Sequence, residues 1–129
     1  EDPFERGRRA VLNLGHTFGH ALELVSDYRM RHGEGVAIGL VAAAHLSAAI
    51  GQCEPELVQR IRRVVERHDL PVRAQVGSVD QVVDAMSNDK KRRGKTLRFV
   101  IPHRIGDVDT IDNPGWEVVR GALSAVLNE

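Results

Sequence analysis

Apolar residues recur at helical spacing through the first half of this chain, and this pattern restricts the possible folds more than any other feature. The third helical segment is the clearest, because Pro55 suits a first turn and an apolar stripe follows it. The stripe consists of Leu57, Ile61, Val64, Val65 and His68. Two helices are expected before it, over about residues 9 to 27 and from His32 to Gly51, where Gly51 suits a left-handed cap.

The second half of the chain predicts shorter elements. Residues 78–81, Ser-Val-Asp-Gln, have the pattern of a capping box that opens a helix to about Ser87. The runs 97–101 and 108–111 have β-type composition and predict a small hairpin. Asn113-Pro114 predicts the cap and first turn of a last helix. Its core-facing residues would be Trp116, Val119, Leu123 and Val126. We therefore expect a mainly α fold, a multi-helical domain with one β-hairpin.

Size and charge restrict the class of protein. The 129 residues suit one domain, and 18 basic residues balance 18 acidic ones, so no net field attracts nucleic acid or an anionic membrane. The most apolar stretch, residues 36–50, is too short for a membrane span of roughly 20 residues. The single cysteine, Cys53, excludes an internal disulfide and favours the cytoplasm. An opening without Met or a secretion signal predicts a piece excised from a longer protein.

Three histidines form the most informative cluster. His16 and His20 lie four residues apart on one helical face, with Gly15 and Gly19 beside them, and His32 starts the next helix. Neutral imidazole is a suitable ligand for zinc and for metals of similar softness. Spacing alone leaves open a metal site, a catalytic site or ordinary hydrogen-bonded histidines, and it does not separate ligands from acids or bases.

Three segments carry recognisable motifs in a fixed order. They are Arg9-x-x-x-Asn13-x-Gly15-His16-Thr17-x-Gly19-His20-Ala21-x-Glu23, then His32-Gly33-Glu34-x-Val36-Ala37-Ile38-Gly39, then Asp89-Lys90-Lys91 with Leu97-Arg98-Phe99-Val100 and Ile105-Gly106. Together they resemble the carboxy-terminal, metal-binding domain of the 3-dehydroquinate synthase family, within the sugar phosphate cyclase superfamily. The resemblance extends from Glu5 to about Gly106, and Gly35 stands where that family commonly has Ala.

The resemblance implies a role for each site residue. His16 and His32 match the ligands of a divalent metal, zinc or cobalt, which a Glu from another domain completes. His20 matches the residue that contacts the substrate phosphate and transfers protons. Arg9 and Asn13 match substrate-binding positions. Lys90, favoured over Lys91, matches a phosphate contact.

The resemblance also implies an activity for the full-length protein. It is an NAD- and metal-dependent carbon-oxygen lyase of the shikimate pathway. This enzyme converts 3-deoxy-arabino-heptulosonate 7-phosphate, a phosphorylated seven-carbon sugar acid, to 3-dehydroquinate with loss of phosphate. The implied enzyme is a homodimer whose N-terminal α/β NAD-binding domain precedes residues 1–129 and is absent from them. We expect the fragment alone to be inactive.

Three alternatives remain open. Another sugar phosphate cyclase is one, although Asn13 and His20 argue against it. An iron-type alcohol or glycerol dehydrogenase is the second, although it needs no phosphate contact from Lys90. A non-catalytic helical module is the third. The basic run 90–95 is by itself a solvated loop or an anion patch, and Glu34 is either a partner that orients an imidazole or a helix-start acid.

Overall fold

The computed structural model describes residues 15–27, 29–75, 77–93, 98–104 and 107–127. These residues form helices α2 (His16–Val25), α3 (His32–Ala49), α4 (Pro55–Arg67), α5 (Val79–Arg93) and α6 (Trp116–Val126). They also form strands β1 (Arg98–Arg104) and β2 (Asp107–Asp112), which pair in an antiparallel sheet. The expected mainly α fold with a single small hairpin is confirmed for the described part of the chain.

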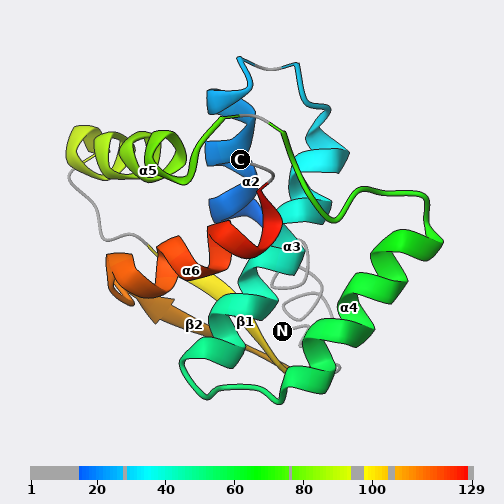
Figure 1. Cartoon of the computed structure of the whole chain (residues 1–129). Helices are drawn as coiled ribbons and strands as arrows, with labels where there is room; N and C mark the ends of the chain where they lie inside the picture. Colours follow the sequence, from blue (N-terminus) through cyan, green and yellow to red (C-terminus); the bar gives the residue numbers. More distant parts are fainter. Residues whose placement is uncertain (1–14, 28, 76, 94–97, 105–106, 128–129) are drawn as a thin grey trace, which may run out of the picture.

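Helix α3 runs through the middle of the molecule (Figure 1). It is apolar on all sides, as a helix must be when neighbours cover it all round. Helices α2, α4 and α6 and strand β1 pack on it. Its fully buried residues include Ile38, Val41, Ala42, Ala44 and Leu46. Within the described ranges, no helix is both long and apolar enough to cross a membrane.

The first helices largely match the expectation. Gly51 has a φ of 75°, which is the left-handed conformation expected of it after α3. Pro55 occupies the first turn of α4. The beginning of the expected first helix, residues 9–14, lies outside the described residues.

The expected apolar stripe of α4 is partly wrong. Leu57, Val58 and Val65 are buried, whereas Val64 is 52% exposed and His68 is exposed. Helix α4 packs mainly on one neighbour, α3, so it buries only a narrow row. Val64 lies beside that row and faces solvent.

Helix α5 is longer than expected. The capping box is present, because the Ser78 backbone N–H donates to Gln81 Oε1 at 2.9 Å and the Gln81 N–H donates to Ser78 Oγ at 3.2 Å. The helix then continues to Arg93 instead of ending near Ser87. No Gly or Pro interrupts residues 79–93, and Lys and Arg are good helix formers. Lys90 and Lys91 therefore belong to a helix rather than to a loop.

The last helix begins later than expected. Helix α6 starts at Trp116 and not at Pro114, because Gly115 adopts a φ of 104° immediately before it. Only glycine adopts this backbone conformation without strain, so the chain turns here and Asn113 is not the helix cap. Of the four expected core residues, Val119, Leu123 and Val126 are buried, and Trp116 is partly buried against the core.

Hydrogen bonds from α2, from α3 and from the turn after α3 fix the position of the hairpin. Ser47 of α3 is fully buried, and its hydroxyl donates to the Pro102 carbonyl at 2.5 Å. His103 bonds through Nδ1 with the Gln52 carbonyl at 2.6 Å. The Thr17 hydroxyl donates to the Arg98 carbonyl at 2.7 Å. Strand β1 is thus held against the start of α2, where His16 lies.

The buried position of His45 predicts that the stability of this domain depends on pH. Burial lowers the pKa of His45 below its ordinary value, and the positive charges of Arg62 and Arg73 lower it further. Its Nε2 is buried and has no hydrogen-bond partner in the described part of the chain. The folded state therefore favours neutral His45, while the unfolded chain protonates it near its ordinary pKa of about 6.5. The stability that comes from keeping His45 neutral in the folded state is present above about pH 6.5 and is lost as the pH falls.

We expect His45→Leu to reduce the loss of stability between pH 7 and pH 5.5. The substitution removes the titrating group and replaces its unpaired ring nitrogen with a side chain of similar size. Urea unfolding of both proteins at several pH values measures the effect. Parallel pH dependences of the two proteins would show that His45 contributes nothing to it.

Candidate metal and substrate site

The site begins with an unusually close contact between α2 and α3. Four glycines form it: Gly15 and Gly19 from α2 and its N-cap, and Gly35 and Gly39 from α3. A Cβ placed at Gly19 would lie 2.8 Å from the Gly35 carbonyl oxygen, and one at Gly39 would lie 2.8 Å from the Gly19 nitrogen. The two backbones therefore touch directly, and any side chain at the centre of this contact would separate the helices.

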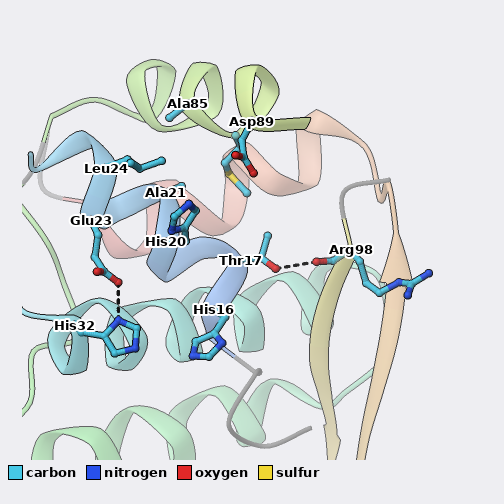
Figure 2. A pocket seen from close by; sticks show the side chains of 11 residues that line it. His16, Thr17, His20, Ala21, Glu23, Leu24, His32, Ala85, Asp89 and Arg98 are labelled. Atoms are coloured by element: carbon cyan, nitrogen blue, oxygen red, sulfur yellow. Dashed lines mark hydrogen bonds and ion pairs between the residues drawn. The ribbon is translucent and has the colours of Figure 1, made fainter. Parts of the chain in front are cut away.

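This contact brings two histidines together. His16 is the first residue of α2 and His32 is the first residue of α3. Their ring centroids are 5.8 Å apart with the ring planes tilted by 46°, and both residues are exposed. His20 follows one turn after His16, and Figure 2 shows it farther along α2, nearer Asp89. The rings of His16 and His32 thus lie side by side, and His20 lies apart from them on the same helix.

A cavity of about 410 Å³ joins these histidines to α5. Apolar atoms come from α2 and from Ala85 and Met86 of α5, and Asp89 adds a carboxylate. Arg98 also lines the cavity, but its guanidinium donates to the Asp112 carboxylate at 2.7 Å. That hydrogen bond lowers the pKa of the Asp112 carboxyl. Figure 2 shows the Arg98 side chain pointing away from the histidines.

A glutamate on α2 supports His32. Glu23 Oε2 lies 2.9 Å from His32 Nδ1, and only 12% of the Glu23 side chain is exposed, against 70% for His32. Glu34 has a different task, because its Oε1 accepts the backbone N–H of Arg31 at 3.1 Å. Of the two interpretations of Glu34, the structure favours the helix-start acid. The imidazole partner is Glu23, which sequence reasoning placed in the motif but gave no role.

The remaining candidate residues are distributed unevenly. Arg9 and Asn13 lie outside the described residues. Lys90 lines a second, smaller cavity with Trp116 and Val119 at the start of α6, while its neighbour Asp89 faces the histidine cavity. The structure therefore brings together His16, His20 and His32, but it does not bring Lys90 to them.

The donor chemistry of the histidine pair fits a borderline-soft divalent ion. Two neutral imidazoles at the end of a partly polar cavity suit zinc or cobalt. Across the described ranges, no group of three His, Cys, Asp or Glu side chains is arranged to hold a metal. Within these ranges, His16 and His32 are thus two candidate donors and not a complete ligand set.

Solved structures share this fold. A 2-epi-5-epi-valiolone synthase from Streptomyces hygroscopicus subsp. jinggangensis 5008, solved with NAD+ and Zn2+ bound, superimposes with a TM-score of 0.76 at 24% identity. The match covers 87% of this chain and 31% of that one. A 2-deoxy-scyllo-inosose synthase with carbaglucose-6-phosphate, NAD+ and Co2+ gives a TM-score of 0.67 at 18% identity, over 86% of this chain and 32% of that one. The fold is thus that of a domain of sugar phosphate cyclases.

Sequence similarity specifies the family. Residues 1–92 match the family model described as 3-dehydroquinate synthase C-terminal. The 3-dehydroquinate synthase of Corynebacterium glutamicum (strain R) is 36% identical over 98% of this chain and 34% of its own length. That of Thermobifida fusca (strain YX) is 40% identical over 95% and 33%. The chain belongs to the 3-dehydroquinate synthase family, as its motifs predict, and it spans about a third of the length of these relatives.

Proposed function

We propose that this chain is the carboxy-terminal part of a longer 3-dehydroquinate synthase. That enzyme would convert 3-deoxy-arabino-heptulosonate 7-phosphate to 3-dehydroquinate and phosphate, with NAD as a cofactor that shows no net reduction. The observation that carries the proposal is the meeting of His16, His20 and His32 at one cavity in a member of this family. The NAD-binding α/β domain and the third metal ligand would come from a part of the longer protein that lies outside this chain.

The three histidines divide the work in this proposal. His16 and His32 would hold the metal, which supplies Lewis-acid chemistry to substrate oxygens when it is bound. His20 would contact the phosphate and move a proton, because it lies on the same cavity but apart from the pair. Arg9 and Asn13 would bind the substrate and hold it in the reactive orientation.

Further parts of the proposal rest on the resemblance alone. The resemblance is the reason for including Lys90 as a phosphate contact. Its side chain lines the neighbouring cavity and not the one that the histidines line. A homodimer of the full-length protein and a cytoplasmic location have the same basis, together with the single cysteine.

The test is turnover by the full-length protein. With 3-deoxy-arabino-heptulosonate 7-phosphate, zinc or cobalt and NAD, we expect one phosphate released for each 3-dehydroquinate formed and no accumulation of NADH. Formation of 2-epi-5-epi-valiolone or 2-deoxy-scyllo-inosose from another sugar phosphate would identify a different cyclase. Net NADH production from an alcohol or polyol would identify a dehydrogenase. If the full-length protein shows neither turnover nor metal binding, the remaining interpretation is a non-catalytic helical module.

A further inference from the structure

Glu23 is poorly exposed for a carboxylate, and its position is closely defined. It lies seven residues after His16, two helical turns along α2, so both side chains project from the same side of that helix. Its side chain passes over Gly35, where an added Cβ would lie 3.2 Å from Glu23 Cγ and 3.4 Å from Oε2. The helix contact that brings the histidines together thus also determines where this carboxylate lies.

The contact with His32 determines which ring nitrogen carries the proton. An ionised carboxylate only accepts hydrogen bonds, so the atom that faces Glu23 Oε2 at 2.9 Å has to be a protonated Nδ1. In a neutral imidazole the other nitrogen, Nε2, is then unprotonated and keeps its lone pair. A metal binds this form, and an outer carboxylate that orients a ligand histidine is a recurrent feature of metal sites.

We propose that Glu23 is a positioning residue that fixes the tautomer and ring orientation of His32 so that Nε2 is presented to the metal. This inference rests on the proposed function and adds a residue to its site. Figure 2 shows the Glu23 carboxylate next to Nδ1 of His32, with the rest of the ring pointing away from Glu23. Because the two nitrogens of an imidazole point in diverging directions, a metal on Nε2 lies away from Glu23. Glu23 therefore acts through His32 and is not itself a ligand.

Zinc affinity of the full-length protein tests the effect on the metal. Competition with a chromophoric chelator should show that Glu23→Ala weakens zinc binding by about 10- to 100-fold. Glu23→Gln should lose less, because its amide oxygen still accepts the Nδ1 hydrogen. Glu34→Gln is the matched control, since it neutralises a nearby carboxylate that bonds the Arg31 backbone instead of an imidazole, and it should bind zinc normally.

The tautomer itself gives a readout that is independent of metal and of activity. Two-bond proton–nitrogen correlation spectra of the metal-free full-length protein, labelled at histidine, should show His32 protonated at Nδ1. The signal is assigned by its absence in His32→Gln. In Glu23→Ala, His32 should shift toward the other tautomer. A merely structural role for Glu23 would leave this spectrum unchanged.

The possible failures are distinguishable. Unchanged zinc affinity and an unchanged His32 tautomer in Glu23→Ala would overturn the positioning role alone. A loss in Glu23→Gln as large as in Glu23→Ala, together with a changed cobalt absorption spectrum, would make Glu23 a direct ligand instead. If the unmodified full-length protein binds neither zinc nor cobalt, the proposed function fails together with the positioning role, whatever the tautomer of His32.

Discussion

Replacing His16 or His32 with Ala should leave the full-length protein without its metal, whereas His20→Ala should keep the metal and lose turnover. His16→Ala and His32→Ala each remove one of three proposed protein ligands, so the coordination shell of the metal is incomplete. His20 lies apart from the pair whose rings are 5.8 Å apart, and its proposed task is proton transfer. That task typically contributes about 10²- to 10⁴-fold, so His20→Ala should lower turnover by this factor at normal metal content.

Plasma mass spectrometry of the purified variants, beside a phosphate-release assay, measures both effects. His68→Ala is the matched control, because His68 is exposed at the end of α4, where it bonds the Val64 carbonyl. It should retain both metal and activity. A metal-free His20→Ala beside a metal-loaded His32→Ala would mean that the i, i+4 pair on α2 is the real chelate, and the assignment would be wrong.

The periodic parts of the fold were the predictable ones. Helix α4 follows from apolar spacing and Pro55, the end of α3 from Gly51, and the hairpin from its two β-type runs. The predicted helix ends were wrong where one local sequence signal was outweighed by a neighbouring one. Asn113-Pro114 has the chemistry of a helix start, but Gly115 turns the chain after it and delays α6. The charged run after Ser87 suggested a loop, but nothing in it breaks a helix.

The site was predictable in its parts but not in its arrangement. Spacing identified His16, His20 and His32 as candidates, and only the resemblance separated the ligands from His20. The contact between Glu23 and His32, on which the proposed role of Glu23 rests, depends on how α2 crosses α3, which is a tertiary property that residue spacing does not contain. A usable signal did exist: Glu23 follows His16 by two full turns, so a helix that presents the histidine also presents the carboxylate.

The glycine contact between α2 and α3 should be the most sensitive packing element of the site. Gly39→Ala inserts a Cβ into the backbone of α2, 2.8 Å from the Gly19 nitrogen, and backbone cannot move aside as a side chain can. We expect a loss on the order of 3 kcal/mol, because overpacking typically costs 1–3 kcal/mol and here the helices themselves have to separate. Separation also moves His16 away from His32, so zinc affinity should fall together with stability.

Two other glycines of α3 provide a graded comparison. Gly35→Ala places its Cβ 3.2 Å from the flexible Glu23 side chain and 3.3 Å from the Gly19 carbonyl oxygen, so shifts of a few tenths of an ångström relieve the contact and its effect should be smaller than that of Gly39→Ala. Gly33→Ala meets no atom within 4 Å and should stabilise the helix by up to about 1 kcal/mol. Thermal unfolding midpoints and chelator competition on the three full-length variants should therefore rank Gly33→Ala above Gly35→Ala above Gly39→Ala. A Gly39→Ala protein with an unchanged midpoint and unchanged zinc affinity would show that the close crossing is not what brings the two proposed ligand histidines together.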